Sequence, residues 1–232
     1  MAFAPGLLSG RRALITGGGT GLGRSIGRRF LALGASLAIC GRREEVLRAT
    51  AEAFRAEMPG ARVTTHPCDI RDPAAVEAML EEVWREGCAD ILVNNAAANF
   101  LARTHRLSAR AVDAVLGTTL HGAAYCTIGC GRRWIEAGQP GVVLSILTLS
   151  ALQGGAFTVP SAMAKAGLLA MTQSLAVEWG PRGIRMVAIA PGTFPTEAAV
   201  ARLRPAGVEH GGVPLRRAGR HEELADLAAF LV

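Results

Sequence analysis

Short apolar runs alternate with longer amphipathic stretches along nearly the whole chain. The apolar runs lie at residues 11–18, 35–41, 61–69, 89–96, 141–147 and 184–192. The stretch between the first two carries apolar residues at a helical spacing, namely Leu22, Ile26, Phe30 and Leu33. Strands joined through helices run parallel, because each connection returns to the same end of the sheet. The pattern predicts a doubly wound parallel α/β sheet in three layers, with ligands at the carboxyl ends of the strands.

The composition agrees with one domain built around a buried sheet. Of the 232 residues, 50% are hydrophobic and 19% are charged, which argues against disorder. No apolar run is long and uninterrupted enough to span a bilayer, and the first residues lack the layout of a signal peptide. We therefore expect a single domain over residues 1–232, located in the cytoplasm.

The net charge of +6 points to a small anionic ligand. The arginines are scattered in short pairs without basic runs or interleaved aromatic residues, so we expect neither nucleic acid nor a membrane as a partner. The five cysteines include no Cys-x-x-Cys pair, and the five histidines show no metal-ligand spacing. A disulfide framework and a metal site are therefore not expected, and the cysteines are interpreted as small core residues.

The end of the chain departs from the regular alternation. Residues 204–223 are rich in glycine, proline and arginine, which predicts a mobile flap over the substrate. A helix follows and closes the chain, at a point where one more edge strand is expected to complete such a sheet.

A glycine-rich turn follows the first predicted strand and opens the first helix. Its sequence, TGGGTGLG over residues 16–23, places glycines where a turn is too tight for a Cβ atom and where the backbone must approach a pyrophosphate closely. The helix amino terminus behind it favours negative charge. This combination predicts a Rossmann-type dinucleotide site formed by Gly17, Gly19, Thr20, Gly21, Leu22 and Gly23.

Arg42 and Arg43 follow the second strand, where a site selective for NAD carries an acidic residue for the ribose hydroxyls. A guanidinium group suits the 2′-phosphate of NADP, so we expect NADP(H) as the cofactor. The alternative is that both arginines are simply the solvated start of the next helix. Two further strand ends complete the predicted nucleotide site: Asp69 and Ile70 at the adenine, and Asn95 and Ala96 at the adenosine ribose.

In this order, the motifs TGGGTGLG, CDIRDP, NNAA, AMAKAG and APG resemble the short-chain dehydrogenase/reductase family over residues 10–232. The segments NNAAANF, VPSAMAKAG and LAVEWGPRGIR are more narrowly similar to its 2,4-dienoyl-CoA reductase branch. The resemblance implies an oxidoreductase of fatty acid metabolism in which NADPH delivers hydride to a conjugated thioester. It also implies a homotetramer, in line with helical stretches near 111–138 and 162–180 that are apolar on more than one face.

The tyrosine that the family uses for catalysis is missing. Most members carry Tyr-x-x-x-Lys, whereas this chain has Ser161 four residues before Lys165. The 2,4-dienoyl-CoA reductase branch has Ser-x-x-x-Lys and takes its tyrosine from the loop after the fifth strand. That position is Ser150 here. The single tyrosine of the chain, Tyr125, lies in the predicted helix before the fifth strand.

The resemblance nevertheless assigns a set of hydrogen-bond donors to the thioester oxygen. Asn99, Ser161 and Lys165 match the asparagine, serine and lysine of the branch, and Ser150 takes the place of the phenol. Lys165 is the only lysine among the 25 cationic residues, and its compact ammonium group can hydrogen-bond the nicotinamide ribose where a rigid guanidinium fork cannot. Ser145, at the end of the fifth predicted strand, matches the catalytic serine of the general family, and it either orients the site or satisfies hydrogen bonds at the strand end.

The remaining site residues also follow from the resemblance. The segment after the sixth strand, Pro191, Gly192, Thr193 and Phe194, is expected to pass under the nicotinamide and hold its carboxamide. The acyl-CoA is expected to contact Arg71, Phe100, Ser108 and Arg202, with the two arginines facing its phosphates. The alternative for both arginines is surface ion pairing.

The leading hypothesis is therefore an NADPH-dependent reductase of an unsaturated acyl-CoA thioester. One alternative is a carbonyl or enoyl oxidoreductase acting on another substrate through the same cofactor site. A second alternative is a catalytically degenerate NADP-binding protein, suggested by the missing tyrosine.

Overall fold

The computed structural model describes residues 3–196 and 213–232, which form one α/β domain. Its six parallel strands lie in the order β3-β2-β1-β4-β5-β6. Their bounds are Arg12–Thr16 (β1), Ser36–Gly41 (β2), Val63–Pro67 (β3), Ile91–Asn94 (β4), Gly141–Ile146 (β5) and Ile184–Ile189 (β6). The strand order reverses direction between β1 and β4, so the carboxyl ends of these two strands mark the expected ligand crevice. The predicted doubly wound sheet is confirmed.

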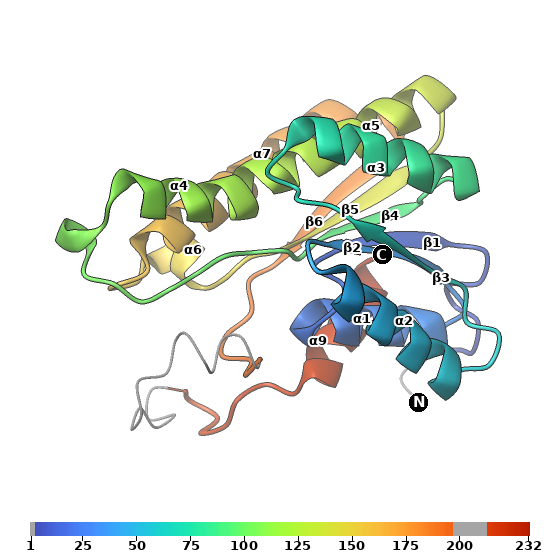
Figure 1. Cartoon of the computed structure of the whole chain (residues 1–232), viewed down its shortest axis with the longest axis horizontal. Helices are drawn as coiled ribbons and strands as arrows, with labels where there is room; N and C mark the ends of the chain where they lie inside the picture. The colour runs from blue at the N-terminus through green and yellow to red at the C-terminus, as the bar shows by residue number, and fades with distance from the viewer. Residues whose placement is uncertain (1–2, 197–212) are drawn as a thin grey trace.

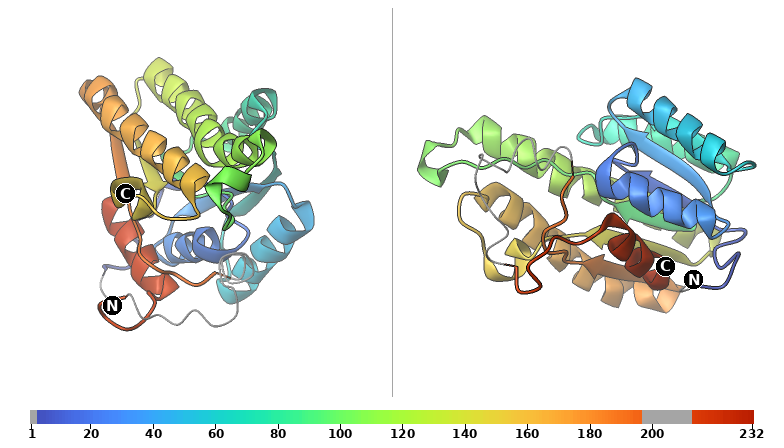
Figure 2. Two further views of the ribbon diagram at one scale, coloured as in Figure 1. Left: turned by 90° about the vertical axis from the view of Figure 1, so that its left-hand side faces the viewer. Right: turned by 90° about the horizontal axis from the view of Figure 1, so that it is seen from below.

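Two layers of helices cover the sheet (Figure 1, Figure 2). One layer consists of α1 (Gly21–Ala32), α2 (Glu44–Glu57) and α9 (His221–Leu231), and the other consists of α3 (Pro73–Glu86), α5 (Gly122–Ala137) and α7 (Val159–Trp179). Two shorter helices, α4 (Ala109–Leu116) and α6 (Ser150–Gln153), project beyond the carboxyl ends of the strands. These two helices flank the end of the sheet where a ligand is expected.

The local sequence accounts for the helix starts and for the core. Asp72 accepts hydrogen bonds from the Ala74 and Ala75 amides at 2.9 and 3.4 Å and caps α3, with Pro73 as its first residue. Alternate residues of β1 face opposite layers, because successive side chains of a strand point to opposite faces. Ile15 lies in the core under α1, α2 and α9, whereas Leu14 lies in the core under α3 and α5.

The cysteines behave as small core residues. Four of the five are buried, namely Cys40, Cys68, Cys126 and Cys130. Burial raises the pKa of each of these thiols, to about 11 at Cys68, so they stay protonated at neutral pH. Among the described residues no cluster of histidine, cysteine or acidic side chains is arranged to hold a metal ion. None of the described helices is long and apolar enough to cross a membrane.

The predicted flap coincides only in part with the described residues. Positions 204–212 lie outside them, and residues 213–220 form neither helix nor strand, with a turn at residues 214–215. His221, Glu222 and Glu223 are the first turn of α9, so the prediction that the irregular segment extends to residue 223 is wrong. The Glu223 side chain accepts a hydrogen bond from the Arg220 backbone amide at 2.8 Å, which starts the helix earlier than the glycine and arginine content suggests.

Candidate functional site

The glycine-rich turn between β1 and α1 is tight because its glycines pack against backbone and core atoms. Gly17 and Gly21 have φ angles of +64° and +52°, in the left-handed region that favours glycine. A Cβ atom on Gly18 would lie 2.7 Å from the Ile39 side chain, and one on Gly23 would lie 2.5 Å from the Gly17 carbonyl oxygen. The turn therefore needs glycine at the positions where the sequence has it.

The amino terminus of α1 suits an anion. Within the described part of the chain, no side chain caps this terminus, and no acidic residue occurs in the first turn. Thr20, the residue before the helix, is extended and makes no side-chain capping bond. Unsatisfied first-turn amides and the helix dipole attract a phosphate group. The predicted turn residues therefore fit the pyrophosphate of a dinucleotide.

The end of β4 is bound tightly to this turn. The Asn95 side-chain amide donates to the carbonyl oxygens of Thr16 at 3.0 Å and Gly17 at 3.2 Å. The backbone amides of Asn95 and Ala96 both donate to the Thr16 hydroxyl at 3.0 Å. The Asn95 amide protons therefore brace the turn, and the predicted ribose contact of this side chain is restricted to its oxygen.

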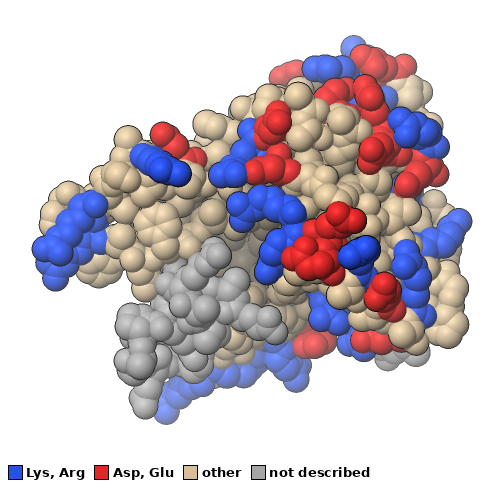
Figure 3. Space-filling model, in the orientation of Figure 1, with Lys and Arg blue, Asp and Glu red and all other residues tan. Residues whose placement is uncertain are grey.

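Arg42 and Arg43 lie beyond the carboxyl end of β2, and both are exposed. Neither forms an ion pair with another described residue. Arg42 is close enough to Asp69 to contribute to lowering the pKa of its carboxyl group. In Figure 3, arginines are interspersed with acidic side chains on the visible face and do not form one continuous patch.

Asp69 and Arg71 were expected at different ligands, but the structure pairs them with each other. The Arg71 Nε lies 2.9 Å from one Asp69 oxygen and 3.0 Å from the other, and the Arg71 terminal nitrogen also contacts the carboxylate. The bond to Arg71 lowers the pKa of Asp69, so its carboxylate stays charged. Because the pair is largely exposed, it contributes little stability, and a ligand can replace either partner.

Lys165 and Ser161 lie one turn apart on the buried face of α7, each 5% exposed. The Lys165 Nζ donates to the main-chain carbonyl oxygen of Ile146, the last residue of β5. The ammonium group is thereby held at the carboxyl end of the sheet. Burial lowers the pKa of Lys165 to about 8. The chain, whose other cationic residues are all arginine or histidine, thus places its one lysine in a buried position beside the expected ligand crevice.

The lowered pKa makes stability depend on pH. In the unfolded chain the amine keeps its ordinary pKa of 10.5, so the unfolded state binds more protons than the folded state between pH 8 and 10.5. The burial cost is fully present below pH 8 and is relieved as the pH rises. Between pH 7 and 9.5, we expect the free energy of unfolding of the wild type to rise by about 2 kcal/mol relative to that of the Lys165→Met variant. Urea unfolding of both proteins at the two pH values measures this difference. An equal change in unfolding free energy with pH in both proteins would contradict it.

The other three predicted catalytic residues occupy different environments. Ser150 is the first residue of α6 and is half-buried. Asn99, in the loop after β4, accepts a hydrogen bond from the Phe100 amide at 2.9 Å. Ser145 is fully buried, and its hydroxyl has no hydrogen-bond partner among the described residues. The strand-end bonds considered for Ser145 are therefore not observed, and its side chain lies beneath the surface of the site.

Thr119 has a role that the sequence did not reveal. It is fully buried in a single π-helical turn, Gly117–His121, between α4 and α5. Its hydroxyl accepts a hydrogen bond from the Ala98 amide at 3.0 Å, next to Asn99. Such turns occur often at functional sites, but one extra residue in a helical turn hardly changes the apolar periodicity. No sequence pattern therefore signalled it.

The segment after β6 is braced by a residue that lies just before α9. The Thr193 carbonyl oxygen accepts a bond from the Gly219 amide at 2.9 Å, and a Cβ on Gly219 would lie 2.3 Å from the Phe194 ring. Pro191 and Gly192 precede this contact, with Gly192 exposed and Pro191 half-buried. The predicted nicotinamide contact of these residues stays a prediction.

The predicted substrate residues are only partly brought together. Phe100 is half-buried near Asn99, whereas the Ser108 hydroxyl accepts the Ala111 amide at 3.2 Å and caps α4. Arg202 lies outside the described residues. Ser108 thus has a structural role that the resemblance did not imply.

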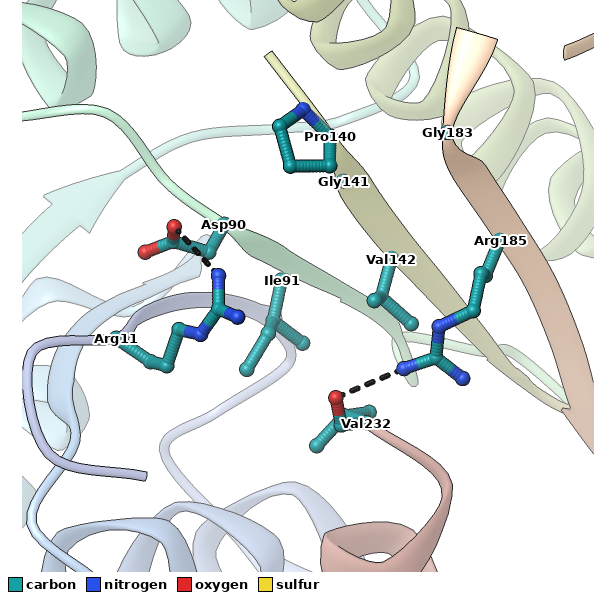
Figure 4. A pocket seen from close by; sticks show the side chains of 9 residues that line it. All are labelled: Arg11, Asp90, Ile91, Pro140, Gly141, Val142, Gly183, Arg185 and Val232. Carbon is teal, nitrogen blue, oxygen red and sulfur yellow. Dashed lines mark hydrogen bonds and ion pairs between the residues drawn. The ribbon is translucent and has the colours of Figure 1, made fainter. Parts of the chain in front are cut away.

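A small pocket of about 100 Å³ lies at the opposite end of the sheet (Figure 4). Its lining includes the first residues of β4 and β5, and its charged groups are already paired. Arg11 lies 3.3 Å from Asp90, and Arg185 donates to the Val232 carbonyl oxygen at 2.9 Å. Because ligands of doubly wound sheets bind at the carboxyl ends of the strands, this pocket is separate from the candidate site.

Comparison with known families agrees with this geometry. The family model described as enoyl-(acyl carrier protein) reductase matches residues 17–232. The chain belongs to the short-chain dehydrogenase/reductase family. Within the family it resembles the 2,4-dienoyl-CoA reductases.

Individual relatives cover almost the whole chain. An uncharacterised oxidoreductase of Caenorhabditis elegans is 44% identical over 100% of this chain and 76% of its own length. A probable 2,4-dienoyl-CoA reductase of Bacillus subtilis is 37% identical over 96% of this chain and 89% of its own length. A solved gluconate 5-dehydrogenase of Burkholderia cenocepacia, in complex with NADP and tartrate, is 30% identical. It superimposes with a TM-score of 0.90 over 97% of this chain and 89% of that one.

Proposed function

We propose that the protein is an NADPH-dependent reductase of an unsaturated acyl-CoA thioester. The observation that carries the proposal is the buried Lys165 ammonium group at the carboxyl end of β5, one helical turn from the buried Ser161. Burial of a lone cation is costly, so a chain keeps one where its charge is used. The resemblance to 2,4-dienoyl-CoA reductases supports the substrate class.

A bound NADPH would supply the hydride for the far end of the conjugated system. The turn residues would hold its pyrophosphate, and Arg42 would neutralise its 2′-phosphate. Lys165 and the hydroxyl and amide donors, Ser161, Ser150 and Asn99, would stabilise the negative charge that develops on the thioester oxygen. Because an aliphatic hydroxyl is a much weaker acid than a phenol, we propose that water supplies the proton that completes the reduction.

The cofactor preference rests on Arg42. We expect Arg42→Ala to raise the KM for NADPH about 10- to 100-fold and to leave the KM for NADH unchanged. This fold-change corresponds to the loss of one hydrogen bond between charged groups. Arg48→Ala is the matched control, because this arginine is also exposed and lies in the second turn of α2. Steady-state kinetics with both dinucleotides measures the effect. An equal rise for NADPH and NADH would contradict the 2′-phosphate role.

The substrate is tested by following NADPH consumption with 2,4-dienoyl-CoA, 2-enoyl-CoA and a panel of ketones, with Lys165→Ala as the background. Turnover of dienoyl-CoA above that background supports the proposal. Turnover restricted to ketones would assign the protein to carbonyl reduction instead. The replacement of the catalytic tyrosine by serine motivates a third interpretation, a degenerate binding protein. Tight NADPH binding without turnover of any substrate would support that interpretation and contradict the proposal.

We also propose a homotetramer. Ile128 on α5 and Val177 on α7 are 48% and 81% exposed, although both helices already cover the sheet with another face. Large exposed apolar side chains on neighbouring helices are typical of a subunit interface. We expect light scattering to give four times the mass of the chain, and Val177→Glu to lower that mass. A monomeric wild type would contradict the proposal.

A further inference from the structure

His221 joins the two ends of the candidate dinucleotide site. It is the first residue of α9, and its ring lies between α1 and the segment that follows β6. The Nε2 atom is 2.7 Å from the Pro195 carbonyl oxygen, and the Nδ1 atom is 3.1 Å from the Ser25 hydroxyl. Ser25 lies in the second turn of α1, and its hydroxyl oxygen is also 3.1 Å from the carbonyl oxygen of Gly21. Three separate elements therefore meet at one imidazole.

The hydrogen-bond chemistry fixes how the ring is used. A carbonyl oxygen can only accept, so Nε2 carries a hydrogen atom and donates it to Pro195. In the neutral ring, Nδ1 is then an acceptor, so the Ser25 hydroxyl directs its single hydrogen to Nδ1 and not to the Gly21 carbonyl oxygen. The contact to Pro195 is short. Because Nε2 belongs to a rigid ring attached to a helix, the direction of this hydrogen bond is also fixed.

The segment held by His221 lies directly on the pyrophosphate turn. A Cβ atom on Gly21 would lie 3.1 Å from the Thr196 methyl group, so residue 196 packs against the first residue of α1. Two residues before His221 lies Gly219, whose amide donates to the Thr193 carbonyl oxygen. The segment 193–196 is therefore held at Thr193 by Gly219 and at Pro195 by His221.

We propose that His221 is a positioning residue for the dinucleotide, holding the segment 193–196 against the amino terminus of α1. This inference rests on the proposed cofactor site, but it does not depend on which thioester is reduced. It predicts that loss of the ring weakens NADPH binding and leaves turnover at saturating NADPH unaffected. A residue needed only for folding would lower the amount of active protein instead.

The test compares His221→Pro with His221→Gln. Proline suits the first position of a helix, so His221→Pro keeps the start of α9 and removes both hydrogen bonds. Glutamine can donate to Pro195 and accept from Ser25. We expect the Kd for NADPH, measured by fluorescence of the bound nucleotide, to rise about 3- to 10-fold in His221→Pro and to return to within about 2-fold of wild type in His221→Gln. Phe230→Ala, at an exposed position near the far end of α9, is the matched control.

A spectroscopic measurement tests the contact without the cofactor. Nitrogen-15 NMR of the histidine rings at pH 8 is expected to show His221 with its hydrogen on Nε2. A hydrogen on Nδ1, or an unchanged NADPH Kd in His221→Pro, would overturn the inference. If the wild type bound NADPH and reduced no thioester, the proposed substrate would be wrong and the role of His221 would stand.

Discussion

Lys165→Ala is expected to lower the rate of NADPH-dependent reduction by about two to three orders of magnitude. The variant loses the one cation that the described structure buries at the carboxyl end of β5, and with it the charge that is proposed to stabilise the thioester oxygen. The loss should appear in kcat as well as in the KM for NADPH, because the same ammonium group is proposed to contact the nicotinamide ribose. Steady-state kinetics at saturating thioester, with the nucleotide varied, separates the two effects.

Lys165→Arg sharpens this prediction. A guanidinium group keeps the charge, but it is planar and larger. The residue that it replaces, Lys165, is only 5% exposed. We expect it to restore less than about a tenth of the lost rate, since misplaced donors contribute little to catalysis. Gln173→Ala, at an exposed position of the same helix, is the control. An arginine variant as active as wild type would show that charge alone is required.

Ser150→Tyr is expected to raise kcat about 10- to 100-fold. In the branch that the chain resembles, a tyrosine at this position supplies the acidic hydroxyl, and one well-placed donor in such a site is worth two to three orders of magnitude. Ser150 is half-buried at the start of α6, which projects beyond the sheet, so a phenol can extend from it without displacing core atoms. The gain is measured with dienoyl-CoA and NADPH.

Ser161→Tyr is the matched comparison, because most of the family carries tyrosine at that position. Ser161 is only 5% exposed here, and inserting a phenol into a filled position costs about 1–3 kcal/mol. We therefore expect Ser161→Tyr to lower the melting temperature and to give no gain in rate. If Ser161→Tyr were stable and faster while Ser150→Tyr had no effect, the site would follow the general family arrangement and not that of the 2,4-dienoyl-CoA reductases.

The sequence predicted those parts of the molecule that depend on periodicity and on backbone geometry. Alternating apolar runs predicted the parallel sheet, the glycine spacing predicted a tight turn before α1, and the Asp72-Pro73 pair predicted the start of α3. Each of these signals is local, since it involves residues within one turn or one strand of each other. The position of Lys165 on the same helix face as Ser161 followed from the same reasoning.

The sequence could not predict which polar groups bind one another across the fold. Asp69 was assigned to the adenine, and Arg71 to the acyl-CoA or to a surface ion pair. The structure pairs the two with each other, and the Asn95 amide protons bind the turn. The Thr119 contact to Ala98 depends on a π-helical turn, which a pattern of apolar residues does not record. Side-chain partners of this kind are set by tertiary packing, where several alternatives have similar local sequence.

The lysine at the centre of the proposal is anchored to a main-chain oxygen and not to a side chain. Replacing the Ile146 side chain would therefore leave the anchor in place, whereas any shift of β5 along its neighbours would carry the amine with it. The alignment of Ile146 with Ile189 on the adjacent strand thus sets the depth of the Lys165 amine. Insertions or deletions near the ends of β5 should be far more harmful to the chemistry than substitutions within it.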